Sequence, residues 1–476
     1  MLFSSTTFLF LFLPITILLY FMMPKKLRNG VLLLVSLIFY GWGEPRLVIL
    51  MLISILVGYL TGIMVYHARK QNRAAMAKAA VWIAVVYNVG VLAVYKYTDF
   101  FISNINHLFH TDFALWKLAL PLGISFYSFQ MMSYTIDVYR NDAKVQWNPI
   151  NLAAYLTLFP QLIAGPIVRY QTVADQIEDS TESFDLFSAG VCRFLAGLGK
   201  KILLANTIGE LFSTLSVLPV SENSIALAWL SSFAYTFQIY FDFSGYSDMA
   251  IGLGKMFGFE FLENFEYPYI SRSITEFWRR WHISLSSWFR EYVYIPLGGS
   301  RQGKAKTIRN IFIVWFLTGF WHGAAWNFII WGMYFFCLLM IEKLFLLKVL
   351  EKVPAWIQHL YTLFFVNLSW VIFSYDTLGS LGNALGNMFG FTRLPLWNEM
   401  TGYYYTAYAF ILIILVLAST PYPKLWYEKL VTGLDQKKAG VFTGTALQTV
   451  LVLAVLLMST ACLASDSFNP FLYFRF

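Results

Sequence analysis

The sequence predicts an all-α polytopic membrane protein of about eleven to thirteen helical segments, some of them re-entrant or broken. Of its 476 residues, 58% are hydrophobic and only 13% are charged, whereas soluble domains have about 45–50% apolar and about 25% charged residues. The uncharged stretches are apolar on every side, while the strands of a membrane β-barrel alternate with a polar lumen face over about 10 residues. Helices are therefore expected, in a single membrane domain over 1–476 without a separate soluble catalytic domain.

The first five segments alternate with connectors whose charge predicts their orientation. The uncharged stretches cover 5–23, 31–43, 47–66, 79–95 and 118–136. The first has no basic flank and no cleavage site, so we expect a retained helix and not a signal peptide. Connectors 24–30 and 67–78 are basic, whereas 98–116 contains no Lys or Arg. Basic loops stay cytoplasmic, which predicts an extracytoplasmic N-terminus, and the basic stretch 424–438 puts the C-terminus on the same side.

The stretch 147–168 is uncharged but contains Pro149, Pro160 and Pro166. Proline removes a backbone donor and breaks helices, so this stretch predicts a re-entrant segment and not a clean crossing. Further helices are expected over 187–218, 224–241, 355–374, 401–419 and 441–462.

A polar string follows one of these helices, at 238–248, and contains Asp242 and Asp248. Two carboxylates six residues apart do not share a helix face. We interpret the string as a polar hinge that caps helix ends.

The block 267–310 combines aromatic and basic residues, among them Trp278, Arg279, Arg280 and Arg290. It fits an amphipathic segment whose cations face anionic lipid headgroups. Charge alone favours this interpretation, but the cluster also fits a site for a phosphate-bearing coenzyme, because guanidinium groups bind phosphate bidentately. The spacing does not separate the two interpretations.

His282 lies inside this block, where lipid contact alone does not explain it. A helix over 275–290 would place Trp278, His282 and either Leu285 or Ser286 on one face. That face is expected to line a cavity.

His322 is the one histidine in 311–341, a stretch without Asp, Glu, Lys or Arg that has basic residues on both sides. This pattern predicts a helical hairpin that turns near Gly323 within the membrane, with His322 at its bottom. An ionisable residue at that depth is a functional-site hypothesis, and histidine suits proton transfer near neutral pH. The alternative is a neutral histidine that hydrogen-bonds between helices.

No metal site is predicted. A zinc site needs three or four ligands at workable spacing, but His282 and His322 are 40 residues apart, and no HxxxH, HExxH or CxxC motif lies nearby. The three cysteines, Cys192, Cys337 and Cys462, lie in or beside apolar stretches and form no such cluster.

Four stretches together resemble the membrane-bound O-acyltransferase superfamily, and most closely its bacterial branch of alginate and peptidoglycan O-acetyltransferases. They are QLIAGPI at 161–167, the string at 238–250, EFWRRWHISL through YIPLGG at 276–299, and TGFWHG at 318–323. The resemblance implies a many-helix bowl around a central tunnel, with a cytoplasmic funnel and catalytic region at 267–323 and an outer opening for the acceptor.

The resemblance also implies residue roles. His322 falls on the invariant histidine of the superfamily, and His282 falls on a second polar position where many relatives have Asn or Asp. His322 would take the proton of the acceptor hydroxyl, while His282 or a neighbouring donor would stabilise the oxyanion. The acyl-donor funnel would contain the four residues Trp278, Arg279, Arg280 and Arg290.

The implied reaction moves an acetyl group from cytoplasmic acetyl-CoA to an extracytoplasmic acceptor, for O-acetylation of a cell-envelope polysaccharide. Acetyl-CoA enters as a substrate, and no permanently bound cofactor is expected. The expected partners are an extracytoplasmic acetyl-accepting protein or transferase, a cell-envelope glycan and membrane lipid, but no nucleic acid. The expected location is the bacterial cytoplasmic membrane.

Three alternatives stay open. D-alanyl transfer to teichoic acids would use a carrier-protein thioester as the donor. A polar-solute transporter could also contain histidines within the membrane, and a lipid-binding scaffold would not need His322. Each alternative predicts a different result when His322 is changed.

Overall fold

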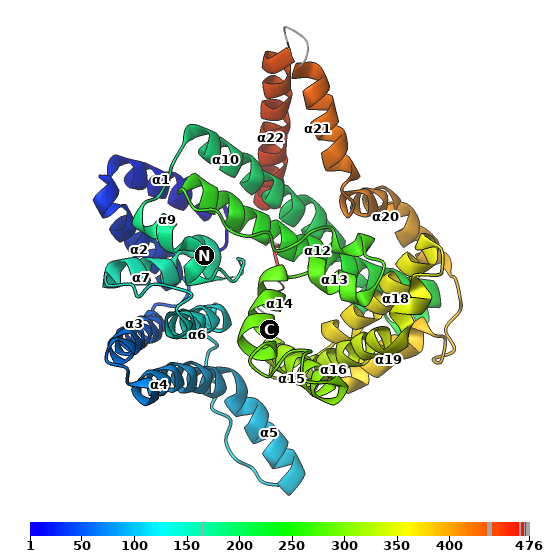
Figure 1. Cartoon of the computed structure of the whole chain (residues 1–476). Coiled ribbons are helices and arrows are strands. Elements are labelled where there is room, and N and C mark those ends of the chain that lie inside the picture. The colour runs from blue at the N-terminus through cyan, green and yellow to red at the C-terminus, as the bar shows by residue number, and fades with distance from the viewer. Residues whose placement is uncertain (164, 436–439, 466–467, 471, 473–476) are drawn as a thin grey trace. The chain divides into compact units, whose positions relative to one another are not determined.

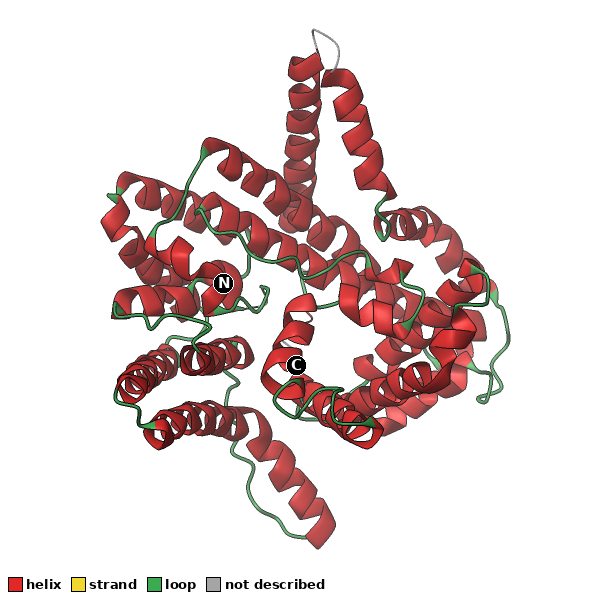
Figure 2. Cartoon of the chain, in the orientation of Figure 1, coloured by secondary structure: helices red, strands yellow, loops and turns green. Residues whose placement is uncertain are grey.

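The computed structural model describes residues 1–163, 165–435, 440–465, 468–470 and 472. Helices and loops account for all of these residues, and no strand occurs among them (Figure 2). The chain divides into two compact units, which we treat separately. The first unit contains 1–194 and 246–262, and the second contains 195–245 and 263–476.

The first unit is an all-helical assembly in which α3, α4 and α6 pack against one another and α2 packs on α7 (Figure 1). Short π- or 3-10-helical pieces are labelled η. In chain order its elements are η1 (Phe8–Phe12), α1 (Leu13–Met22), α2 (Lys25–Gly41), α3 (Val48–Lys70), α4 (Ala74–Leu92), η2 (Ala93–Tyr97), α5 (Thr98–Phe109), α6 (Ile124–Arg140), α7 (Pro149–Thr157), α8 (Phe159–Leu162) and α9 (Tyr170–Glu178). The expected connector at 98–116 is wrong in its first part, because α5 continues the helix there.

The proline-rich stretch forms broken helices, as predicted. Pro149 begins α7, and Pro160 lies in the single turn α8. Side chains satisfy backbone groups that the break leaves without helical partners: the Ser36 hydroxyl accepts a hydrogen bond from the Phe159 amide, and the Tyr155 hydroxyl donates to the Val168 carbonyl. Broken backbone at membrane depth requires such internal partners.

The second unit holds the block and both histidines that the sequence singles out. Two helices, α10 (Phe184–Gly199) and α12 (Ile225–Met256), contribute residues to both units. The other elements of the second unit are η3 (Lys200–Asn206), α11 (Thr207–Ser216), η4 (Val220–Glu222), η5 (Pro268–Ile270), α13 (Ile274–Arg280), α14 (Ile283–Phe289), η6 (Arg290–Tyr294), α15 (Lys304–His322), α16 (Trp326–Ile341), η7 (Glu342–Leu346), α17 (Leu347–Leu350), α18 (Ala355–Ser374), α19 (Leu378–Met388), α20 (Glu399–Ala418), α21 (Tyr422–Asp435) and α22 (Gly440–Ser465).

The predicted hairpin is present as α15 and α16, which pack along each other and join through 323–325. Glycine permits the close approach. A Cβ at Gly319 would overlap the carbonyl oxygen of Phe328, and a Cβ at Gly332 would overlap that of Trp315. Small residues allow helix backbones to come together in membranes. His322 is the last residue of α15, next to the turn.

The predicted hinge at 238–248 is wrong, because α12 runs through it without a break. The two aspartates lie on different helix faces, as their spacing requires. In the first unit, Asp248 pairs with Arg193 at 2.6 Å, whereas Asp242 belongs to the second unit and has another partner.

Five helical segments among the described residues are long and apolar enough to cross a membrane. They are Val48–Lys70, Ala74–Phe109, Ala355–Ser374, Glu399–Ala418 and Gly444–Ser465. The third coincides with the helix expected at 355–374. The chain is thus an all-helical protein with several apolar spans.

Candidate active site

The chain turns sharply at His282, between α13 and α14. Its φ and ψ are 45° and 54°, a left-handed conformation that is uncommon for a residue with a side chain. The continuous helix expected over 275–290 is therefore wrong. As a result His282 leaves the face of Trp278, Leu285 and Ser286 and lines a different cavity.

Asn264 holds this turn from the loop that follows α12. Its backbone carbonyl accepts a hydrogen bond from the Ile283 amide at 3.0 Å. Its side-chain Oδ1 accepts from the Ser284 amide at 3.1 Å and from the Ser284 hydroxyl at 2.9 Å. The same oxygen lies 3.2 Å from Nδ1 of His282. A left-handed residue persists where its surroundings over-determine it, and these bonds supply that constraint.

Glu342 fixes the start of α13. Its carboxylate is fully buried and accepts hydrogen bonds from the Ile274 amide at 2.6 Å and the Thr275 amide at 2.8 Å. The Thr275 hydroxyl also donates to it, at 2.6 Å. An anion at a helix N-terminus satisfies free amides and the helix dipole. This contact ties α13 to the end of the α15–α16 hairpin.

His282 and His322 line one buried cavity, which we call the histidine cavity. Its volume is about 30 Å³, above the about 10–15 Å³ that is needed to hold one water molecule. The other lining residues are Ile239, Asp242, Phe243, Trp281, Trp331, Trp370, Phe373 and Leu472. His282 is 1% exposed and His322 is 9% exposed. The hairpin and the turn thus bring together two imidazoles that are 40 residues apart in the sequence.

Aromatic rings enclose both imidazoles. The centroid of the His322 ring lies 4.9 Å from that of Trp331 and 5.3 Å from that of Phe373. The His282 ring makes an edge contact with Phe243 at 4.7 Å. These apolar walls lower the local dielectric constant, so polar interactions beside them are stronger than in solvent.

A buried ion pair stands at one side of the histidine cavity. Lys201 Nζ of η3 lies 2.5 Å from Oδ1 of Asp242, and both side chains are almost completely buried. Lys201 also donates to Asn206 Oδ1 at 3.0 Å and to the Pro470 carbonyl. The Leu472 amide donates to Asp242 Oδ2 at 3.1 Å. The described part of the C-terminal tail is thereby anchored against the cavity.

A second cavity, of about 510 Å³, carries exposed cations at its rim. We call it the cationic cavity. Arg279, Arg290 and Lys343 line it, and none of the three forms an ion pair with another described residue. Its walls are apolar and include Trp278, Leu285 and Phe289.

Two indoles in contact form the boundary between the cavities. Trp278 lines the cationic cavity and Trp331 lines the histidine cavity, and their ring centroids are 5.7 Å apart in an edge-to-face arrangement. The cationic cavity therefore lies one side chain away from the residues that enclose His322.

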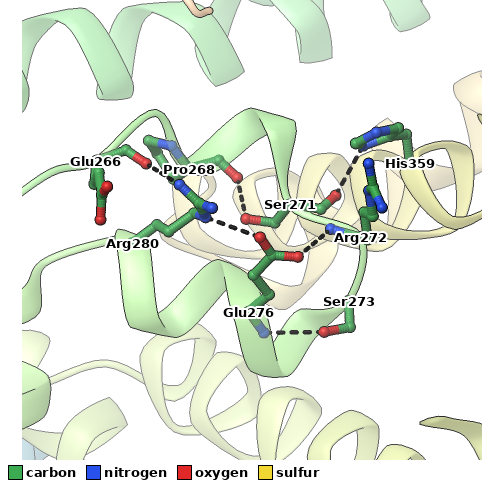
Figure 3. A network of polar contacts seen from close by, with 8 residues as sticks. All are labelled: Glu266, Pro268, Ser271, Arg272, Ser273, Glu276, Arg280 and His359. Atoms are coloured by element: carbon green, nitrogen blue, oxygen red, sulfur yellow. Dashed lines mark hydrogen bonds and ion pairs between the residues drawn. The ribbon is translucent and has the colours of Figure 1, made fainter. Parts of the chain in front are cut away.

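Arg280 does not line the cationic cavity with Arg279 and Arg290. It donates to Glu276 Oε1 at 3.0 Å and to the Glu266 carbonyl at 3.1 Å (Figure 3). With Arg272 and His359 it lines a third cavity, of about 680 Å³. The structure thus brings together three of the four expected donor-funnel residues.

The sequence interpretation missed Asn264, Lys201, Glu342 and Lys343. No spacing rule connects them to the histidines, because each reaches the site through a contact distant in the chain. For Asn264 the only local signal is a polar side chain 18 residues before His282. No group of three or more His, Cys, Asp or Glu side chains with metal-binding geometry occurs in the described part of the chain.

Comparison with known proteins decides the family. Residues 33–380 match the sequence profile of MBOAT, the membrane-bound O-acyltransferase family. The chain belongs to this family. It is therefore an O-acyltransferase. This enzymatic function takes the place of the transporter and scaffold hypotheses. The matched region includes the histidine cavity's His282 and His322 as well as Asn264. Family membership and the apolar helices together indicate a multi-pass membrane protein.

Relatives within the family carry different names. The chain is 38% identical to "Probable alginate O-acetylase AlgI" of Azotobacter vinelandii over the full length of both proteins. It is 34% identical to "Peptidoglycan O-acetyltransferase" of Helicobacter pylori, over 83% of this chain and 81% of the relative. It is 33% identical to "Teichoic acid D-alanyltransferase" of Bacillus subtilis, over 45% of this chain and 56% of the relative.

Removal of the buried cation should destabilise the site. Lys201→Met leaves the Asp242 carboxylate buried and unpaired, which costs about 3–5 kcal/mol. The double variant Lys201→Met/Asp242→Leu removes both charges and should recover most of the loss. Thermal unfolding of the purified protein in detergent measures both. Equal stability of the single and double variants would contradict the ion pair.

Proposed function

We propose that this protein is an O-acetyltransferase that moves an acetyl group from cytoplasmic acetyl-CoA to the hydroxyl of an extracytoplasmic acceptor in cell-envelope polysaccharide O-acetylation. One observation carries the proposal: His282 and His322 line the same cavity, in a chain that belongs to the O-acyltransferase family. The names of the alginate and peptidoglycan O-acetyltransferase relatives support a polysaccharide as the final acceptor.

The proposed chemistry is the attack of a hydroxyl on a thioester carbonyl. His322 takes the hydroxyl proton as the C–O bond forms, and an N–H donor in the cavity stabilises the oxyanion of the tetrahedral intermediate. The C–S bond then breaks, and the thiolate leaves with a proton from the imidazolium. His282 or a neighbouring donor is the first candidate for the oxyanion role.

The size and charge of the histidine cavity favour an acetyl group. About 30 Å³ accommodates a group of a few atoms but not a long acyl chain. D-alanyl transfer, the second candidate, brings an ammonium group that needs a counter-charge. Asp242 is the carboxylate among the described lining residues, and Lys201 already pairs with it. The teichoic acid relative also aligns with less than half of the chain.

The cationic cavity is the proposed entry for acetyl-CoA. Arg279, Arg290 and Lys343 can bind the phosphate groups of the coenzyme, while the apolar wall beside Trp278 receives the pantetheine arm. The basic character of 267–310 supports a cytoplasmic position for this entry. We propose that a central tunnel then delivers the acetyl group to the opposite side of the bacterial cytoplasmic membrane.

The acceptor reaches the site from outside. We propose an extracytoplasmic acetyl-accepting protein or transferase as the partner that passes the group to the glycan. Both termini would then lie on the extracytoplasmic side, which the distribution of basic loops supports.

Substitution of His322 tests the reaction. His322→Ala should lower the incorporation of labelled acetyl into the cell envelope by about 100-fold or more, because general acid–base catalysis contributes about 10²–10⁴-fold. The control is His107→Ala, which changes an exposed histidine on α5. Membrane levels of the three proteins must match. Undiminished labelling with His322→Ala would contradict the mechanism.

The donor site is tested by Arg290→Gln. Loss of a charge-assisted bond to phosphate, worth about 1.5–3 kcal/mol, should raise KM for acetyl-CoA about tenfold or more with little change in kcat. Arg301→Gln, at an exposed arginine outside the cationic cavity, serves as the control. Equal KM values for the two variants would remove the cationic cavity as the donor entry.

A further inference from the structure

The hydrogen bonds around Asn264 define which atom of its amide faces His282. The Ser284 backbone N–H can only donate, and it points at Oδ1 of Asn264 at 3.1 Å. The atom at that position must therefore be the amide oxygen, since an NH₂ group cannot accept. A flipped amide would place two donors against each other.

This assignment determines the tautomer of His282. Its Nδ1 lies 3.2 Å from the same oxygen. The Ser284 hydroxyl is 3.5 Å from Nδ1, but it donates its hydrogen to Asn264 Oδ1 at 2.9 Å, so Nδ1 carries its own hydrogen and donates it. Burial lowers the pKa of His282 to about 3, because a low-dielectric site disfavours the imidazolium. A neutral ring with hydrogen on Nδ1 has its lone pair on Nε2.

The other ring nitrogen of His282, Nε2, is available to a ligand in the histidine cavity. Asn264 does not line the histidine cavity, whereas His282 does. Nε2 of His282 is buried and makes no hydrogen bond within the described residues. A hydrogen-bond acceptor in an aromatic enclosure needs a donor from the substrate, because a buried acceptor without a partner costs about 1–3 kcal/mol.

We infer that Asn264 is a positioning residue for acyl transfer: it fixes His282 in the tautomer that presents Nε2 to the histidine cavity as a hydrogen-bond acceptor. The inference rests on the proposed function and refines it. Neutral His282 cannot donate to the oxyanion, so that role passes to a neighbouring N–H. Nε2 of His282 instead accepts a hydrogen bond from the incoming acceptor and orients it, while His322 takes the hydroxyl proton.

The indole of Trp331 is suited to donate a hydrogen bond from its N–H to the oxyanion in place of His282. Its N–H is buried, and it makes no hydrogen bond within the described residues. Its ring lines the histidine cavity and contacts His322. An indole nitrogen can only donate, as an oxyanion requires.

Other charged groups around the histidine cavity do not change the tautomer assigned to His282. Among the described lining residues, the titratable groups that face His282 are Asp242 and His322. Lys201 and the Leu472 amide occupy the carboxylate oxygens of Asp242. The group that sets the tautomer of His282 is therefore Asn264.

Asn264→Asp tests the inference by pH dependence. The carboxylate still accepts from Nδ1–H, but it stabilises the imidazolium and raises the pKa of His282 by about one to three pH units. Since His282 must be neutral to accept a hydrogen bond at Nε2, the acidic limb of the rate against pH should move to higher pH. The matched control is Asn367→Asp, a buried asparagine that bonds Ser232 and Thr236 and no histidine. The acidic limb of the pH–rate profile of Asn367→Asp should stay at the wild-type pH.

Two results would overturn the inference. An acidic limb that does not move in Asn264→Asp shows that Asn264 does not act through His282. Higher activity at low pH shows that the imidazolium is the working form and that His282 is a donor. A merely structural role for Asn264 would lower the rate equally at every pH.

A second measurement does not depend on activity. Nitrogen NMR of the full-length protein with ¹⁵N-labelled histidine reads the protonation of each ring nitrogen, and His282→Gln identifies the His282 signals. The expected spectrum has a protonated Nδ1 and an unprotonated Nε2, and the opposite pattern contradicts the inference. Absence of acetyl transfer by the wild-type protein, with the expected spectrum, would overturn the proposed function alone.

Discussion

The left-handed turn at His282 is the constraint on which the site depends. It ends α13 before the chain re-enters a helix, so that Trp278 and Arg279 face the cationic cavity while Trp281 and His282 face the histidine cavity. Such a backbone conformation costs about 1–3 kcal/mol. The bonds from Asn264 to Ile283 and Ser284 offset this cost. Without the turn, one continuous helix would place His282 on the face of Trp278.

The second constraint is the close contact of α15 and α16, which positions His322. Glycines at 319 and 332 allow the two helices to touch where a larger residue would separate them. His322 ends α15 at the short turn, and Trp331 of the facing helix packs against its ring. The same indole contacts Trp278, so one aromatic pair separates the proposed donor entry from the reacting groups. Donor binding and chemistry can therefore lie in adjacent but distinct compartments.

The sequence predicted what depends on local pattern. Hydropathy located α18 correctly, prolines predicted the broken helices α7 and α8, and basic residues on both sides of 311–341 predicted the hairpin with His322 at its turn. Local pattern failed where a contact distant in the chain decides the structure. The helical spacing of 275–290 gives no sign of Asn264. The polar string at 238–248 stays helical because Lys201 and Arg193 compensate its two aspartates.

That the two histidines act as one unit on one acyl group is tested most directly by a double-mutant cycle. Thioester cleavage of labelled acetyl-CoA would be followed with purified protein in lipid vesicles, for His282→Ala, His322→Ala and the double variant. Residues that act as a unit are strongly non-additive, so the double variant should be no slower than the slower single variant, within about twofold. Losses that multiply would show that the histidines contribute independently, and would contradict a shared site.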